Sequence, residues 1–320
     1  MLEQFVDWVV YSLIGLSANS ALGKAVNFFV FDSIKIIALL FVMIFAISIL
    51  RTFISQRKIK ELLTRRGKFS ANTGASIFGA LTPFCSCSSI PIFISLIEAG
   101  VPLGAAFSFL ITSPIVNEYV VIVMLGFFGW EITAAYIISG IAIGVIAGIV
   151  LGKMGLEKHL ETDLISKGKK SGQEEKFESF KKRILFGLTE AASIVKKLWV
   201  WIIVGVGIGA VIHNLVPEEA IHQIISQGGI LTVPIATAIG VPVYGNSVAI
   251  VPIAVALFQK GVPLGTALAF MMAIAALSLP EAVILRRVMK LKLIAIFFTV
   301  VAVAIVATGY LFNILQTVLV

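Results

Sequence analysis

Several windows of the chain carry almost no charge over about twenty residues, the length needed to cross about 30 Å of hydrocarbon. The clearest are residues 28–50, 131–151, 198–215 and 293–315. Hydrophobic residues make up 59% of the 320 residues and charged residues only 13%, far from the balance of a soluble protein. We therefore expect an all-α integral membrane protein, a polytopic helical bundle that crosses the cell (inner or plasma) membrane about eight times.

The basic residues are concentrated in three segments. Of the 25 Lys and Arg residues, 20 fall within residues 51–68, 153–183 and 286–292. Basic loops of this kind lie on the cytoplasmic side of helical membrane proteins. The net charge of +8 therefore reflects membrane topology and indicates the lipid bilayer as a partner, with acidic headgroups as secondary ligands. It does not indicate nucleic acid.

The pentapeptide Gly-Val-Pro-Leu-Gly occurs twice, at residues 100–104 and 261–265, an offset of 161. At the same offset, Phe109 matches Phe270. Because the offset is about half the chain length, the sequence predicts an internal duplication.

Equivalent loops of the two halves differ in charge. Residues 51–68 hold seven basic residues and one acidic residue, whereas their counterpart, residues 213–229, holds two glutamates and no Lys or Arg. By the positive-inside rule, the halves are inserted upside down relative to each other. The sequence therefore predicts inverted-topology repeats with broken or re-entrant helices, an architecture of secondary transporters.

We accordingly divide the chain into a first transmembrane repeat at residues 1–152, a cytoplasmic linker at 153–183 and a second, inverted repeat at 184–320. The linker is rich in Lys, Glu and Gly, which is typical of flexible connections. It lacks the Gly-x-x-x-x-Gly-Lys-Ser/Thr pattern of a P-loop, so ATP-driven transport would need another subunit.

Prolines and polar residues interrupt the apolar segments at matching places in both halves. In the first half, Pro83 and Pro91 bracket a run of small residues, so residues 71–100 are predicted to form two half-helices around an unwound segment at 84–89. The counterpart in the second half is the Pro- and Gly-containing run at 242–248. Paired interruptions indicate a binding site near the membrane midplane.

The chain has two cysteines, and both lie in the first interruption as a Cys-x-Cys pair. Thiolates are preferred ligands of soft metals and metalloids, and an unwound backbone would let both sulfurs face one cavity. The predicted substrate-binding residues are Cys85, Cys87, Ser86, Ser88, Ser89 and Asn246. A redox pair that cycles between dithiol and disulfide is the other interpretation of the cysteines.

A second pair of interruptions, at Pro114 and Pro280, is followed by Glu118 and Glu281. An ionisable residue within apolar sequence is a functional hypothesis by default. A carboxyl in a medium of low dielectric constant can bind and carry a proton. Glu118 and Glu281, together with Asn117, are therefore predicted to couple transport to protons.

Three runs resemble the predicted permeases of the ArsP/YraQ type: Thr-Pro-Phe-Cys-Ser-Cys-Ser-Ser-Ile-Pro at residues 82–91, the pentapeptide at 100–104, and Thr-Ser-Pro-Ile-Val-Asn-Glu at 112–118. The resemblance implies an inner-membrane permease. Some members of that family are similar to exporters of trivalent organoarsenicals such as methylarsenite, and the resemblance implies that the paired cysteines, here Cys85 and Cys87, bind the arsenic.

The expected function is thus efflux of a small soft or thiol-reactive solute, such as a trivalent organoarsenical, by alternating access with proton coupling. No enzymatic activity, cofactor or resident metal is expected, and no oligomeric state is predicted. Two alternatives stay open: a transmembrane thiol–disulfide oxidoreductase, and a permease for a polar or sulfur-containing metabolite that does not use the cysteines.

Overall fold

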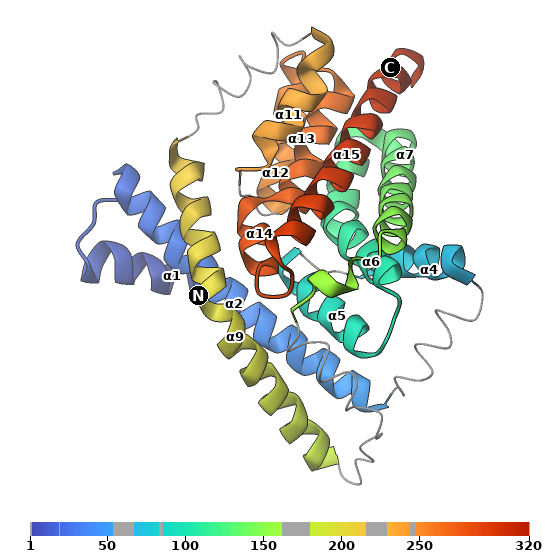
Figure 1. Cartoon of the computed structure of the whole chain (residues 1–320). Coiled ribbons are helices and arrows are strands. Elements are labelled where there is room, and N and C mark those ends of the chain that lie inside the picture. The colour runs from blue at the N-terminus through green and yellow to red at the C-terminus, as the bar shows by residue number, and fades with distance from the viewer. Residues whose placement is uncertain are drawn as a thin grey trace.

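The computed structural model is a bundle of helices (Figure 1). It describes residues 2–18, 20–53, 67–82, 86–161, 180–215, 229–243 and 247–319. Within these residues every regular element is helical, and extended backbone pairs only in an antiparallel bridge between Leu160 and Met289. The predicted all-α class is confirmed.

The elements follow one another in the order of the two halves. The first half contains α1 (Leu2–Asp7), η1 (Trp8–Leu13), α2 (Ala21–Phe53), α4 (Gly67–Leu81), α5 (Ser86–Glu98), α6 (Leu103–Ile115) and α7 (Glu118–Lys153). The short helix η2 (Leu156–His159) follows α7 directly. The second half contains α9 (Phe180–Leu215), η3 (Gly229–Leu231), α11 (Thr232–Gly240), α12 (Ser247–Gln259), α13 (Leu264–Leu277), α14 (Leu279–Leu285) and α15 (Leu291–Leu319). Gly129, at φ 76° and ψ 178°, divides α7 into two segments, in a conformation essentially restricted to glycine.

Among the described residues, four helical segments are long and apolar enough to cross a membrane: Leu22–Ala46, Glu118–Lys153, Leu264–Leu285 and Leu291–Gln316. The four windows expected to span lie inside α2, α7, α9 and α15, so each is helical as predicted. Shorter apolar helices of 10–17 residues accompany them, at Ser89–Glu98, Leu103–Ile115, Gly229–Gly240 and Ile250–Gln259.

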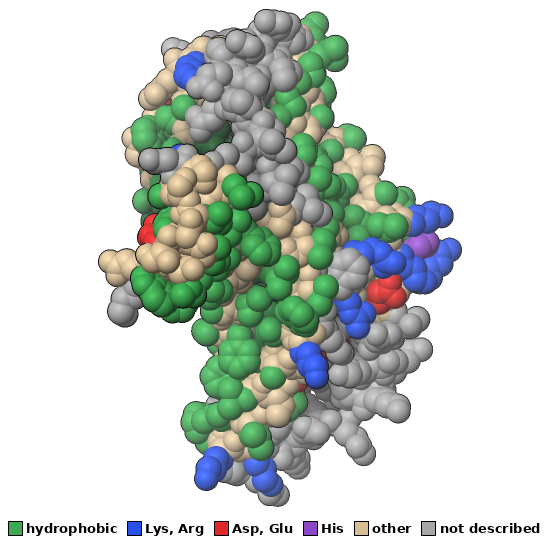
Figure 2. Space-filling model, turned by 90° about the vertical axis from the view of Figure 1, so that its left-hand side faces the viewer, with side chains coloured by type: hydrophobic (Ala, Val, Ile, Leu, Met, Phe, Trp, Pro, Cys, Tyr) green, Lys and Arg blue, Asp and Glu red, His purple; other side chains and the backbone are tan. Residues whose placement is uncertain are grey.

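Apolar side chains cover much of the outer surface of the bundle, as Figure 2 shows for one face. Ile138 on α7 and Val303 on α15 are 68% and 65% exposed. Large apolar surfaces of this extent face lipid in a membrane protein. Together with the four spans, they describe a multi-pass membrane protein.

The two halves pack their helices in the same way. Helices α4, α6 and α7 pack against one another, and so do α11, α13 and α15. A Cβ added to Gly104 of α6 would lie 2.7 Å from the carbonyl oxygen of Gly148 in α7, and one added to Gly265 of α13 would meet the carbonyl oxygen of Gly309 in α15. These two close helix crossings match at the offset of 161 residues. Small residues are what permits such close approach in membranes.

The two copies of Gly-Val-Pro-Leu-Gly also form the same turn. Gly100 and Gly261, the first glycine of each copy, have φ values of 77° and 91°. The next residue in each copy donates its N–H to a carbonyl five residues earlier, at 3.0 Å in both. Positive φ at the residue that follows a helix is the usual role of glycine at a C-terminal cap.

We expect Gly104→Ala to destabilise the protein. The added methyl would lie 2.7 Å from the carbonyl oxygen of Gly148 and 3.1 Å from the Cα of Gly152, both backbone atoms. Overpacking of this kind costs about 1–3 kcal/mol. Gly126→Ala is the matched control, because it is also helical and its added methyl meets nothing within 4 Å. Thermal unfolding in detergent should show a lower Tm for Gly104→Ala alone, and equal values for both variants would contradict the expectation.

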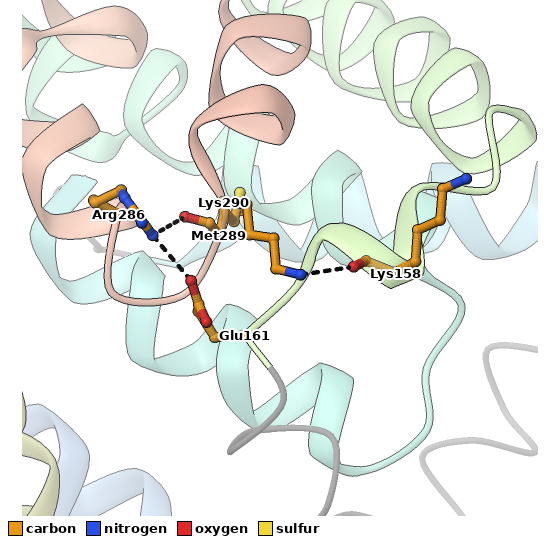
Figure 3. Close-up of polar contacts among 5 residues, drawn as sticks. All are labelled: Lys158, Glu161, Arg286, Met289 and Lys290. Atoms are coloured by element: carbon orange, nitrogen blue, oxygen red, sulfur yellow. Dashed lines mark hydrogen bonds and ion pairs between the residues drawn. The ribbon is translucent and has the colours of Figure 1, made fainter.

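Residues 156–161, here called the linker strap, dock onto the segment between α14 and α15 (Figure 3). The backbone N–H of Glu161 donates to the carbonyl of Val288 at 3.0 Å. The guanidinium of Arg286 donates to the carboxylate of Glu161 at 2.9 Å. The first part of the expected linker is therefore ordered, and it binds the second half.

Candidate functional site

The first interruption lies between α4 and α5. Helix α4 ends at Leu81 and α5 begins at Ser86, so the two predicted half-helices are confirmed. The predicted unwound segment at 84–89 is wrong for residues 86–89, which form the first turn of α5. Serine is favoured at helix N-termini, where its hydroxyl can accept from backbone N–H groups that lack a helical partner.

The predicted binding residues are described to different extents. Cys85 and Asn246 lie outside the described residues, and for residues 86–88 only the backbone is described. This backbone places Cys87 in the first turn of α5, and Ser89 next to it is fully buried. Among the described residues, no group of three His, Cys, Asp or Glu side chains could hold a metal ion.

Helix α5 lies in the interior of the bundle, where it packs against α2, α6 and α14. The ring of Phe93 in α5 lies 5.3 Å from that of Phe107 in α6, which lies 5.5 Å from Phe297 in α15. All three rings are buried, so they link α5 to the second half. Pro91 within α5 has no N–H to donate to the carbonyl of Cys87, four residues earlier.

The second-half interruption lies between Gly240, where α11 ends, and Ser247, where α12 begins. The backbone N–H of Leu279, at the start of α14, donates to the carbonyl of Val241 at 2.9 Å. The two interruptions of the second half therefore meet. Because α14 also packs against α5, it adjoins both the helix that bears Cys87 and the start of the segment that contains Asn246.

The predicted coupling residues lie in different environments. Glu281 in α14 is only 2% exposed, and neither carboxylate oxygen has a hydrogen-bond partner in the described part of the chain. Glu118 is exposed at the first residue of α7. Asn117 caps that helix by accepting a hydrogen bond from the N–H of Val120 at 2.9 Å. A buried carboxyl without a partner costs stability, so Glu281 is the strongest candidate for a functional group.

Asp32 is a buried ionisable residue that the sequence interpretation missed. It lies in α2, within the apolar span Leu22–Ala46, and is 6% exposed. Helix α2 packs against both α5 and α9. The signal was present in the sequence, since a carboxyl inside a strongly apolar window is rare and typically functional.

A buried row of hydrogen bonds between α4 and α6 was missed as well. The hydroxyl of Ser108 donates to the side-chain oxygen of Asn72 at 2.8 Å, and that of Thr112 donates to the hydroxyl of Ser76 at 3.0 Å. The two pairs repeat at a spacing of four residues on both helices, the period at which polar residues share one helix face. Because both pairs are satisfied, they indicate helix association rather than a ligand site.

Comparison with known proteins places the chain among membrane proteins of one kind. Residues 21–314 match the ArsP-type family described as "Predicted permease". The UPF0718 protein MJ0584 of Methanocaldococcus jannaschii is 21% identical over 83% of this chain and 90% of its own length. The UPF0718 protein YcgR of Bacillus subtilis is 33% identical over 38% of this chain and 42% of its own length.

A Streptococcus mutans protein is 28% identical over 38% of this chain and 42% of its own length, and its name proposes a subunit of a two-component membrane permease complex. No solved structure matches the chain. The family match begins at the start of α2 and ends near the end of α15, so it takes in the interruptions of both halves and all four spans except the last two residues of the fourth. This polytopic helical protein belongs to the ArsP-type family of predicted permeases.

Proposed function

We propose that this permease exports a small thiol-reactive solute, such as a trivalent organoarsenical, by alternating access coupled to protons. The observation that carries the proposal is the packing of α5 against α14. Helix α5 begins within the Cys-x-Cys pair, and α14 carries Glu281, buried and without a partner in the described residues. Neighbouring helices from opposite halves thus carry, on one side, part of the Cys-x-Cys pair and, on the other, a buried ionisable group, which supports the proposal.

Two inverted repeats would supply the mechanism of alternating access. They are residues 1–152 and 184–320, joined by a cytoplasmic linker at 153–183. The matched helix crossings and the matched turns support a duplication. Three contacts join helices at equivalent places in the two halves: α2 with α9, α6 with α13, and α7 with α15. Such self-equivalent contacts are expected about a two-fold axis. Rocking of one half against the other would expose the site on alternate sides.

The chemistry of binding needs no oxidant or reductant. A trivalent organoarsenical with two hydroxyl groups reacts with the thiols of Cys85 and Cys87, so that two As–S bonds form and two water molecules leave. Hydrolysis reverses both steps and regenerates the thiols. Ser86, Ser88, Ser89 and Asn246 would line the path of the solute.

Glu281 would link this cycle to protons. Burial without a partner among the described residues disfavours a charged carboxylate, so the residue would hold a proton while α14 is packed and release it when the site opens to water. Glu118, exposed at the start of α7, stays a predicted second coupling residue.

Transport into everted membrane vesicles tests the proposal. Vesicles that contain the protein should accumulate methylarsenite when their lumen is acidified, and a protonophore should stop the accumulation. Vesicles without the protein are the control. Movement of polar or sulfur-containing metabolites without any arsenical would instead support the cysteine-independent permease. Thiol–disulfide exchange through a Cys85–Cys87 disulfide, with no solute movement, would support the oxidoreductase.

A further inference from the structure

The linker strap and the start of α15 together form a cluster of basic side chains, here called the basic cluster: Lys158, His159, Lys290 and Lys292. The pKa of His159 is lowered below its usual value by burial of the imidazole and then by the positive charges of Lys292, Lys158 and Lys290. All three ammonium groups therefore act on one imidazole. The Nδ1 atom of His159 is buried and has no hydrogen-bond partner in the described part of the chain.

The positive charge of the basic cluster is not neutralised within the strap. The carboxylate of Glu161 is paired with Arg286 at 2.9 Å, which leaves Glu157 as the other acidic residue of the strap. The three lysines of the cluster are exposed. The ammonium of Lys290 donates to the backbone carbonyl of Lys158 at 3.4 Å, which holds it over the strap (Figure 3). Figure 2 shows basic side chains gathered with a histidine at one edge of the molecule.

The basic cluster lies where two membrane spans leave the hydrocarbon. One span ends at Lys153, just before the strap, and another begins at Leu291, between the two lysines of the second half. The apolar side chains of Met154 and Leu291, beside these two span ends in the sequence, are 49% and 68% exposed. Ammonium groups beside exposed apolar side chains at a membrane boundary suit a molecule with a phosphate group and acyl chains.

We propose that the basic cluster binds the headgroup of an anionic phospholipid, which bridges the linker strap and the second half. The phosphate would lie among the lysines, and the acyl chains would lie against Met154 and the start of α15. Lys158 belongs to the linker strap and Lys290 to the segment on which the strap docks. A lipid bound to both would therefore stabilise the docked strap. The proposal stands whatever solute the permease carries.

Lipid binding to the purified full-length protein in a neutral detergent tests this proposal by native mass spectrometry. Phosphatidylglycerol and phosphatidylcholine with the same acyl chains are titrated separately. We expect the protein to retain phosphatidylglycerol preferentially, and K158Q/K290Q/K292Q to weaken that retention by about tenfold or more, given the contribution of each basic residue near an anionic headgroup. The single variant K292Q, which changes an exposed side chain and leaves the strap contacts in place, should weaken it severalfold.

The matched control is K24Q/K181Q/K196Q, which removes the same charge from three exposed lysines of α2 and α9 outside the cluster. It should retain phosphatidylglycerol like the unaltered protein. Any of three results would overturn the proposal. The protein could retain the two lipids equally, the control could lose as much phosphatidylglycerol as the triple variant, or K292Q and the triple variant could both retain it fully. Full displacement of phosphatidylglycerol by millimolar inorganic phosphate would also overturn it, because the site would then bind a free anion rather than a lipid.

Discussion

The variant Cys85→Ser/Cys87→Ser is expected to lose all protection against trivalent organoarsenicals, down to the level of cells without the protein. A hydroxyl is a hard, weakly acidic group and does not replace a thiolate as a ligand for a soft metalloid. Cell growth across a methylarsenite concentration series, together with uptake by everted vesicles, measures the loss. Each single variant should lose most of the activity as well, because one As–S bond cannot provide chelation.

Folding of the double variant is checked by its yield and by its Tm in detergent. Serine is close to cysteine in size, and Cys87 lies in a first helical turn where serine is favoured, so no large change in Tm is expected. Full methylarsenite resistance in a well-folded double variant would refute the role of the thiols. Transport of another solute by that variant would identify the protein as a cysteine-independent permease.

Glu281→Gln is expected to abolish proton-driven accumulation while leaving solute exchange intact. Glutamine has nearly the same shape as glutamate but carries no titratable proton. The binding site can therefore still open to either side of the membrane, but no proton moves with that change. Vesicles with the variant should exchange labelled for unlabelled solute at equilibrium. They should not accumulate the solute when an acid lumen is imposed.

The two glutamates can be compared directly. Because Glu281 is buried and its oxygens have no partner among the described residues, replacing it by the uncharged glutamine of nearly the same shape breaks no described hydrogen bond and should not lower the Tm. Glu118→Gln changes an exposed residue at the start of α7. Loss of accumulation in Glu118→Gln, with normal accumulation in Glu281→Gln, would assign the proton to Glu118 and contradict the role proposed for Glu281.

Local composition was enough to predict the helices and their interruptions. The four strongly apolar windows all lie within long helices, because only a helix satisfies backbone groups across hydrocarbon. Prolines predicted the interruption between α4 and α5 and the one between α11 and α12. The unwound segment was predicted to end at residue 89, but the next helix already begins at Ser86. A proline shows that a helix is interrupted nearby, whereas the serines that follow mark the residue at which the next helix starts.

The candidate site was less accessible from the sequence. The motif alone singled out the cysteines, and the sequence pattern placed Glu118 and Glu281 in comparable positions after their prolines and favoured Glu118. The structure separates them, with one exposed and the other buried. Asp32 could have been found by the same reasoning, as an acidic residue in an apolar span.

The sequence by itself determined that this protein is a helical, multi-pass membrane protein, that a pentapeptide recurs at half its length, and where its helices break. Those properties depend on hydrophobicity, on backbone hydrogen bonding and on proline, which act over a few neighbouring residues. Only the tertiary structure decided that α5 lies against α14, that Glu281 is buried with no partner among the described residues, and that the linker strap binds the segment between α14 and α15. Burial and contact join residues more than a hundred positions apart, so they follow from packing and not from local pattern.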